Sequence, residues 1–259
     1  MNKLVLNQLA KVFNIGNQSV EALQDINLTL ASNELAVIVG PSGCGKSTLL
    51  NIVAGLEKST TGSAVMNGQE ICGPGSDRGM VFQSYTLFPW LSVQENVEFG
   101  LKIKGVPDRE RREIAHHYLE LVGLRGFEKT LPKALSGGMK QRVAIARALA
   151  NKPEMLLMDE PFGALDAQTR LVMQELLLSV WEKERTTILF ITHDIDEAIL
   201  LADNLYVMSR RPGRIRAKIK IDIPRPRDHR STLSAQFSTI KKDVMEMLWE
   251  ESQAAAMQK

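Results

Sequence analysis

The sequence predicts an α/β fold in which an antiparallel sheet precedes a parallel sheet. Residues 3–13 and 20–30 alternate apolar and polar side chains, which is typical of antiparallel strands. The apolar run 35–39, a glycine-rich segment over 40–48 and the start of a helix then follow one another directly. Two later apolar runs end in polar residues, as the parallel strands of a ligand-binding α/β sheet do.

Composition limits the classes of protein that the chain can represent. The 259 residues are 44% apolar and carry a net charge of only +2, so bulk charge does not indicate nucleic acid binding. The first residues lack the apolar core of a signal peptide, and no apolar run is long enough to span a membrane. The two cysteines form no disulfide framework, which fits a reducing cytosol.

The glycine-rich segment matches the phosphate-binding pattern G-x-x-x-x-G-K-[ST] of a P-loop. Backbone N–H groups and the following helix N-terminus favour an anion there. We expect Lys46 to reach the β- and γ-phosphates of a nucleotide and the Ser47 hydroxyl to bind Mg²⁺. The Cys44 thiol, beside Lys46 and a helix N-terminus, is expected to be reactive. The segment comprises Gly40, Pro41, Ser42, Gly43, Cys44, Gly45, Lys46, Ser47 and Thr48.

Three features before the middle of the chain have two interpretations each. Phe13 either stacks on an adenine ring or fills the core. Gln83 follows a short apolar strand and either binds Mg²⁺ or an attacking water, or is a surface glutamine. The aromatic stretch 84–91 is either a buried staple or a docking surface.

The middle of the chain is predicted to be helical. Residues 92–103 and 109–124 have helical spacing of apolar residues. Ser136 is a natural N-cap for an alanine-rich helix. Gly137 and Gly138 cost about 1 kcal/mol each relative to alanine, which suggests that something approaches the backbone closely. The helix start is therefore either a second anion site or a plain tight turn.

Polar residues at the ends of three apolar strands predict one shared site. Asp159 and Glu160 end the run 155–158, and His193 ends the run 187–192. An aspartate at a strand end is how P-loop proteins hold the shell of Mg²⁺, and a neighbouring glutamate can take a proton from water. Because ligands bind beyond the carboxyl ends of strands in such sheets, we expect these residues to lie next to the P-loop.

These motifs have the order and spacing found in ATP-binding subunits of ABC transporters, which the chain resembles over residues 3–220. The resemblance implies a P-loop NTPase (RecA-like) core, with an antiparallel β subdomain and an inserted helical subdomain. The core would comprise 1–84 and 152–220, the helical signature subdomain 85–151, and a short C-terminal tail 221–259.

The resemblance also implies roles for single residues. Glu160 would be the catalytic base, His193 the switch histidine and Gln83 the catalytic residue of the Q-loop, and Phe13 would stack on adenine. Mg²⁺ would be bound by Ser47 and Gln83, and by Asp159 through water. The family has a signature motif at the start of the alanine-rich helix, and Met139 stands where the commonest form of that motif has glutamine. The signature residues that would contact a partner's ATP are Ser136, Gly137 and Gly138, and the D-loop residue would be Asp166.

The implied assembly is a membrane-bound importer. Two ATPase subunits, as a homodimer or a paired subunit, would bind ATP and Mg²⁺ between them. Two transmembrane permease subunits would dock near Gln83–Leu91 at the cytoplasmic face of the inner membrane, and an external solute-binding protein would act through them. Segments 87–90 and 208–215 resemble the nitrate, sulfonate, taurine and bicarbonate branch.

A soluble ABC ATPase of DNA repair or translation is the alternative. Such proteins tend to carry a coiled-coil insertion, a second ATPase domain or zinc ligands, and this sequence has none. Nucleic acid is therefore not expected as a partner. In the C-terminal tail, the charges that include Arg225, Arg227 and Arg230 are predicted to form a solvated face, with binding of an anionic regulator or lipid as the alternative.

Overall fold

The computed structural model describes residues 2–16 and 18–256. They form two compact units. Unit 1 comprises Met1–Gly75 and Thr187–Lys259, and unit 2 is the continuous stretch Ser76–Thr186. Within the described part of the chain, no helix is both long enough and apolar enough to cross a membrane.

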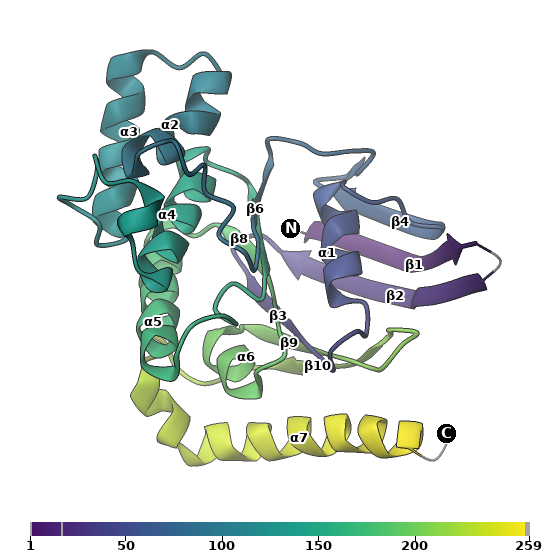
Figure 1. Ribbon diagram of the computed structural model, residues 1–259. Helices are drawn as coiled ribbons and strands as arrows, with labels where there is room; N and C mark the ends of the chain where they lie inside the picture. Colours follow the sequence, from purple (N-terminus) through teal and green to yellow (C-terminus); the bar gives the residue numbers. More distant parts are fainter. Residues whose placement is uncertain (1, 17, 257–259) are drawn as a thin grey trace. The chain divides into compact units, whose positions relative to one another are not determined.

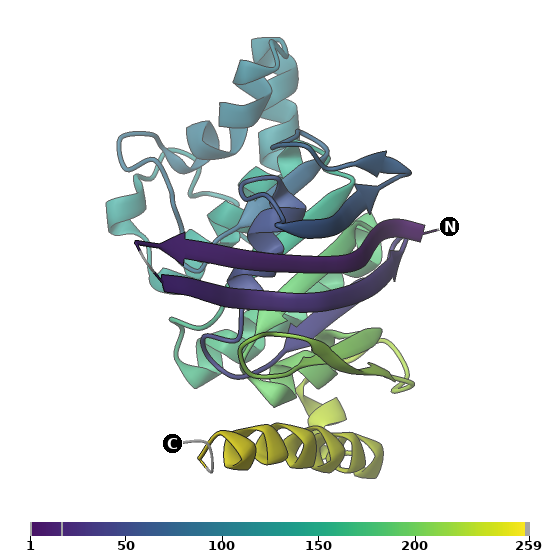
Figure 2. The same ribbon diagram turned by 90° about the vertical axis from the view of Figure 1, so that its right-hand side faces the viewer.

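Unit 1 begins with the predicted antiparallel sheet, whose strand order is β2-β1-β4-β5. Figure 2 shows β1 and β2 as two long, curved neighbouring strands. Alternate apolar residues such as Leu4, Leu6 and Ile26 are buried, which explains the sequence pattern. The strands are β1 (Asn2–Ile15), β2 (Gln18–Ala31), β4 (Thr61–Met66) and β5 (Gln69–Glu70).

The second layer of strands in unit 1 has the parallel pairs that the sequence predicts. β3 pairs in parallel with β8 on one side and with β9 on the other, and β10 pairs antiparallel with β9. Every residue of β3 and β8 is buried, so these strands are continuous apolar runs with no alternation. The strands are β3 (Leu35–Val39), β8 (Thr187–Thr192), β9 (Asn204–Met208) and β10 (Ile215–Lys220).

Helices complete unit 1. Figure 1 shows the final helix, α7, running past α6 and β9. The segment that the sequence predicts as a tail therefore contains a long helix. The helical elements of unit 1 are α1 (Lys46–Ala54), α6 (Ile195–Leu201), η2 (His229–Leu233) and α7 (Ala235–Ala256).

The arginines of this segment correct one sequence prediction. Arg227 is only 5% exposed, and its guanidinium donates to five backbone carbonyls, three of them at the end of α6. Burial lowers the pKa of Arg227 to about 10. Arg225 donates to the Asp203 carboxylate at 2.8 Å. Of these three arginines, only Arg230 is exposed. The predicted solvated face is therefore wrong for Arg225 and Arg227, because they satisfy helix-end carbonyls and a carboxylate.

Unit 2 contains one parallel strand pair, β6 with β7, and a group of helices in which α2, α3 and α4 pack together. The predicted helices 92–103 and 109–124 are confirmed as α2 and α3, within three residues at each end. Ser92 and Glu95 form a reciprocal capping box at the start of α2. The elements are β6 (Arg78–Val81), α2 (Val93–Ile103), α3 (Asp108–Leu121), η1 (Pro132–Ala134), α4 (Gly137–Ala150), β7 (Met155–Asp159) and α5 (Ala167–Glu184).

Candidate nucleotide site

The P-loop has the strand–loop–helix geometry that its sequence predicts. β3 ends at Val39 and α1 begins at Lys46, with Gly45 at the N-cap in the left-handed conformation at φ 104°. A Cβ on Gly45 would lie 2.8 Å from the carbonyl oxygen of Ala22, so both the backbone angle and the space require glycine there. The N-cap residue Gly45 has no side chain with which to cap α1. A helix start of this kind can bind an anion through the backbone N–H groups of its first turn.

Lys46 is held over its own loop. Its Nζ donates to the carbonyl oxygens of Gly40 at 2.9 Å and Pro41 at 3.0 Å, and the side chain is buried. The Cys44 Sγ lies 3.9 Å from the same nitrogen and is only 1% exposed. The thiol is thus shielded, which corrects the expectation of a reactive cysteine. Gly43, by contrast, is exposed with φ 75°, and a Cβ there would meet nothing within 4 Å.

His193 follows the strand next to the P-loop strand. The parallel register of β3 and β8 pairs Val39 with Thr192, so Gly40 and His193 are the next residues on two neighbouring strand ends. His193 is exposed, and the following residue, Asp194, caps α6 by accepting from the Glu197 N–H at 3.1 Å. The prediction that the P-loop and this histidine converge is confirmed within unit 1.

Phe13 lies on the strand pair that borders the P-loop. It pairs with Val20 on β2. Two later residues of that strand, Ala22 and Leu23, lie against Gly45. The Phe13 ring is half-buried, and the Lys11 ammonium lies 4.8 Å from the ring centroid. Phe13 is therefore not a core residue, and its ring is accessible in part.

Unit 2 brings Gln83 and Glu160 together. The parallel register of β6 and β7 pairs Val81 with Met158, so both residues lie two positions beyond paired strand residues. A Cβ on Gly163 would be 3.6 Å from the Gln83 Nε2 and 3.9 Å from the Glu160 Cβ. Glu160 adopts φ 43°, which is uncommon for a residue other than glycine and typical of functional positions. Gln83 is exposed, while Asp159 and Glu160 are half-buried.

The signature segment opens α4 as the sequence predicts. The Ser136 hydroxyl accepts from the Met139 N–H at 3.3 Å, which makes it the N-cap. A Cβ on Gly137 would lie 2.9 Å from the Tyr85 hydroxyl, and one on Gly138 would lie 2.7 Å from the Thr169 methyl. The close approach expected from the glycines is thus made, at least in part, by residues of unit 2 itself.

Asp166 is the N-cap of α5. Its carboxylate accepts from the Thr169 N–H at 3.0 Å, and this hydrogen bond is the main cause that lowers the pKa of Asp166. The sequence indicated only a turn here. The spacing of an aspartate three residues before Thr169 is the signal that would have predicted the cap.

One supporting glycine was missed at the sequence level. A Cβ on Gly213 would lie 2.2 Å from the Cys44 carbonyl oxygen, so the turn after β9 packs directly against the P-loop. Gly213 also exchanges backbone hydrogen bonds with Ala22 and Gln24 on β2. A Pro-Gly dipeptide is typical of a turn, but nothing in the sequence shows what this turn supports.

The structure therefore assembles two groups of predicted residues. Unit 1 brings the P-loop and His193 together, with Phe13 on the bordering strand pair; unit 2 joins Gln83 with Glu160, and places Tyr85 against the signature. That both groups form one site stays a prediction. A buried parallel strand, a glycine loop and an uncapped helix start define a P-loop nucleotide-binding protein.

Comparison with known proteins identifies the family. Residues 23–163 match the family model described as ABC transporter. An uncharacterized ABC transporter ATP-binding protein of Methanocaldococcus jannaschii is 52% identical, covering 96% of this chain and 92% of that protein. A nitrate import ATP-binding protein of Synechocystis sp. is also 52% identical, over 85% and 83% of the two chains. A taurine import ATP-binding protein of Roseobacter denitrificans is 46% identical, over 96% and 95%.

Solved structures agree with this assignment. The chain resembles the dimeric post-hydrolysis state of an ATP-binding cassette bound to ADP and Pi, with a TM-score of 0.74 and 35% identity over 84% of this chain and 98% of that one. The chain belongs to the ATP-binding proteins of the ABC transporter family, and it is an ATPase coupled to transport.

Proposed function

We propose that two copies of this chain, or this chain and a paired subunit, clamp ATP and Mg²⁺ between them to power import of a small anion. The observation that carries this proposal is the pairing of strand ends: Gly40 with His193 in unit 1, and Gln83 with Glu160 in unit 2. Relatives named for nitrate and taurine import support the direction of transport and the class of solute. Nitrate, a sulfonate, taurine and bicarbonate are the candidates.

The phosphates would lie on the P-loop. The exposed Gly43 and the uncapped start of α1 offer backbone N–H groups. Lys46 would exchange its two carbonyl partners for phosphate oxygens, which are stronger acceptors because they are charged. Phe13 would stack on the adenine through the part of its ring that is accessible.

Residues of both units suit Mg²⁺, which prefers oxygen ligands and keeps several waters. The Ser47 hydroxyl is exposed in the first turn of α1, directly after Lys46. In unit 2 the amide oxygen of Gln83 is exposed, and the Asp159 carboxylate ends β7 half-buried, so it would act through water. When bound, the ion would neutralise charge on the β- and γ-phosphates.

Glu160 would take the proton from the attacking water. Its carboxylate lies on a strand end beside Gln83, which would orient the same water. His193 would donate to the γ-phosphate from the strand end next to the P-loop. These roles need Glu160, Gln83 and His193 to reach the same nucleotide, which the proposal assumes.

Dimerisation would complete the site, because a signature segment meets the ATP of the partner chain. Ser136 and the N–H groups at the start of α4 would bind the partner's γ-phosphate. Asp166 would lie at the D-loop position of the same interface. ATP would then favour the closed dimer, because it binds that state better, and hydrolysis would reopen it.

The permease would dock on unit 2, at the segment Gln83–Leu91, called here the docking segment. Trp90 is 72% exposed, and on α2 the side chains of Ile103 and Phe99 are 72% and 36% exposed. The Phe88 ring lies between Trp90 and Phe99, with centroids 5.7 and 4.3 Å away. The half-buried Phe88 would thus hold the segment to α2, and the exposed Trp90 would offer the docking surface.

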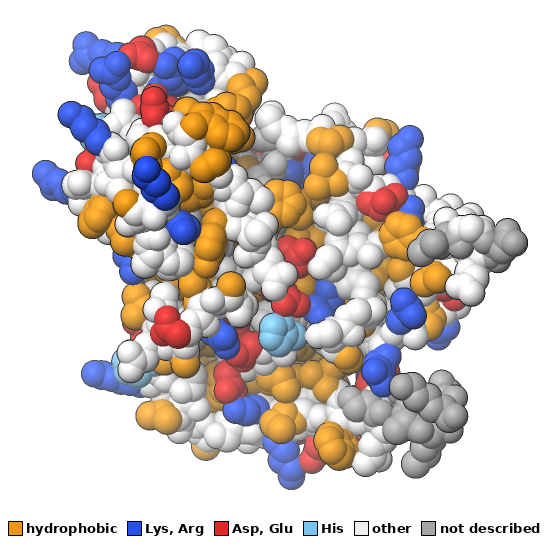
Figure 3. Space-filling view, viewed as in Figure 1, with side chains coloured by type: hydrophobic (Ala, Val, Ile, Leu, Met, Phe, Trp, Pro, Cys, Tyr) orange, Lys and Arg blue, Asp and Glu red, His pale blue; other side chains and the backbone are white. Residues whose placement is uncertain are grey.

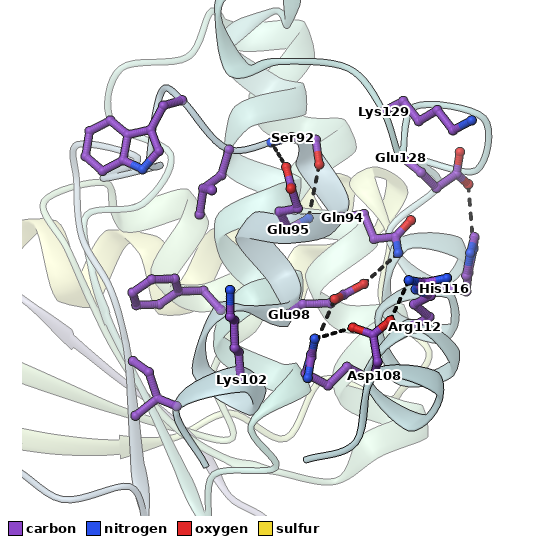
Figure 4. Close-up of a pocket in the computed structure, with 15 residues that line it drawn as sticks. Ser92, Gln94, Glu95, Glu98, Lys102, Asp108, Arg112, His116, Glu128 and Lys129 are labelled. Carbon is purple, nitrogen blue, oxygen red and sulfur yellow. Dashed lines mark hydrogen bonds and ion pairs between the residues drawn. The ribbon is translucent and has the colours of Figure 1, made fainter. Parts of the chain in front are cut away.

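The surroundings suit a helix with apolar and polar faces. Hydrophobic side chains gather over the helices of unit 2 at the upper left of the face in Figure 3. A cavity of about 860 Å³ adjoins them, and Figure 4 shows that charged residues of α2 and α3 line its other side. Such a docked permease would hold the chain, which has no membrane-spanning helix among its described residues, at the cytoplasmic face of the membrane.

Glu160→Gln tests the proposal. The variant keeps the shape of the side chain but cannot accept the proton, so ATP hydrolysis by the reconstituted complex should fall by about 100-fold or more. Nucleotide affinity should stay within about twofold, and ATP-dependent dimers should accumulate because they no longer reopen. Calorimetry and analytical ultracentrifugation measure both. Normal turnover, or a monomer with ATP and the permease present, would overturn the proposal.

A further inference from the structure

One arginine connects the docking segment to α4, the helix that begins at the signature and is called here the signature helix. Arg147, on α4, donates from Nη1 to the Thr86 carbonyl oxygen at 2.8 Å. From Nη2 it donates to the Thr86 Oγ1 at 2.9 Å and to the Tyr85 carbonyl oxygen at 3.4 Å. The guanidinium also lies 5.6 Å from the centroid of the Phe88 ring. A single side chain thus contacts three acceptor atoms on two consecutive residues, together with the Phe88 ring.

The segment held in this way has a strained backbone. Thr86 adopts φ 47°, the left-handed region that β-branched residues strongly avoid. Such a conformation persists only where surrounding contacts fix it. Arg147 contacts Thr86 itself, Tyr85 before it and the Phe88 ring two positions after it, so these contacts fix the strained point.

A second contact joins the same segment to the start of the same helix. The Tyr85 hydroxyl lies where a Cβ on Gly137 would be only 2.9 Å away. The far end of the segment is bound to α2 instead, where the buried Asn96 exchanges hydrogen bonds with the backbone of Phe88 and donates to Leu91. The docking segment is therefore attached to α4 over residues 85–86 and to α2 over residues 88–91.

We infer that Arg147 is a positioning residue that makes the docking segment and the signature helix move together. A displacement of the docking segment would then be passed to Ser136 at the N-terminus of α4. This inference rests on the proposed docking of a permease, because that partner would supply the displacement. Arg147 contacts neither nucleotide nor water in this role; it acts through the backbone of Tyr85 and Thr86.

The role requires arginine and not simply a positive charge. The planar guanidinium presents separate nitrogens to acceptors on adjacent residues, whereas a lysine ammonium is a single point. Arg147 is half-buried, and the partial loss of water around its guanidinium favours contacts that satisfy its N–H groups. Arg147→Lys is therefore the informative variant, since it keeps the charge and most of the stem.

The test compares Arg147→Lys with Arg142→Lys in the reconstituted complex and in the isolated chain. Arg142 lies on the same helix, but its Nη1 donates to the Val122 carbonyl oxygen at 3.3 Å and not to the docking segment. Arg147→Lys should lower stimulation of the ATPase by the permease about fivefold or more, while basal hydrolysis stays within about twofold. Arg142→Lys should keep its stimulation.

Hydrogen exchange of the isolated chain gives a readout that needs no permease. The amides of residues 84–88 should exchange about tenfold faster in Arg147→Lys than in wild type, and those of α2 should not change. Thr86→Val removes one acceptor without touching α4, so it should shift both readouts in the same direction by a smaller amount. If the Arg147→Lys variant does not fold, Thr86→Val is used as the test variant in its place.

Two failures are distinguishable. If the wild-type ATPase is not stimulated by the permease, the proposed function is wrong. If the wild type is stimulated, and Arg147→Lys or Thr86→Val keeps both normal stimulation and normal exchange over 84–88, the assignment of Arg147 is wrong. Loss of stimulation with unchanged exchange would equally overturn it, because the arginine would then act by another route.

Discussion

The P-loop in unit 1 and the signature segment in unit 2 both start a helix at an expected phosphate site, but they are built differently. The P-loop is shaped by its backbone: Gly45 is in the left-handed conformation, Ala22 lies against it, and this glycine is the N-cap of α1. The signature helix is capped by Ser136, and the side chains of Tyr85 and Thr169 pack against its first two glycines.

The difference assigns the two sites different tasks. The glycine N-cap at the P-loop provides no side-chain acceptor to compete with a phosphate, so this helix start should bind nucleotide in a single chain. The signature helix already satisfies one of its N–H groups, and its packing depends on side chains that can rearrange. It is suited to a contact that forms and breaks during each cycle.

The largest expected effect separates the two sites by affinity. Lys46→Met should lower the affinity of the monomeric chain for ATP by about 100-fold or more, because two charge-assisted hydrogen bonds contribute roughly 1.5–3 kcal/mol each. Ser136→Ala should leave that affinity within about twofold and act only in the dimer. Calorimetry at a concentration where the chain is monomeric measures both. Equal losses would abolish the distinction between the sites.

A second comparison concerns glycine. In Gly45→Ala the new Cβ would lie 2.8 Å from a backbone oxygen, and alanine would have to adopt a φ of 104°. The substitution should therefore lower the free energy of unfolding by about 2–4 kcal/mol. Gly138→Ala meets a Thr169 methyl at 2.7 Å, which can move, and it should cost about 1 kcal/mol.

The matched control for this pair removes the methyl group. Adding Thr169→Ser to Gly138→Ala should restore stability, because alanine is otherwise preferred over glycine inside a helix. Urea denaturation measures each step. If the double variant stays as unstable as Gly138→Ala alone, the Thr169 methyl is not what excludes a side chain at Gly138. The contrast with the P-loop, where the backbone excludes it, would then be wrong.

The smallest effect concerns pH. The lowered pKa of Asp166 means that its carboxylate stabilises the start of α5 above the ordinary pKa of aspartate, and that this contribution is lost as the pH falls through the lower, folded value. The thermal midpoint of Asp166→Ala should lie below wild type at pH 7, and the gap should shrink below about pH 4. Asp166→Asn keeps a capping acceptor and should show a smaller gap at pH 7. A gap that does not change with pH would contradict the assigned cap.

Much of the fold was predictable because local patterns and tertiary structure agree. The alternation in β1 and β2, the apolar runs of β3 and β8, and the helical spacing of α2 and α3 each follow from the face that is buried. The C-terminal arginines were not predictable. Arg227 reads as a surface residue until the end of α6 is placed beside it, because only then do unsatisfied carbonyls explain a buried guanidinium.

The sequence by itself predicts the chemistry of this protein: a lysine and glycines for phosphate, oxygen ligands for a cation, a glutamate for a proton, and a serine with two glycines for a second anion contact. These follow from residue types at short spacings, which a chain carries whether or not it is folded. Only the tertiary structure decided what holds them. That Tyr85 lies against Gly137, that Gly213 lies behind the P-loop, and that Arg147 fixes a strained threonine are contacts across long separations, and such contacts exist only once the elements pack.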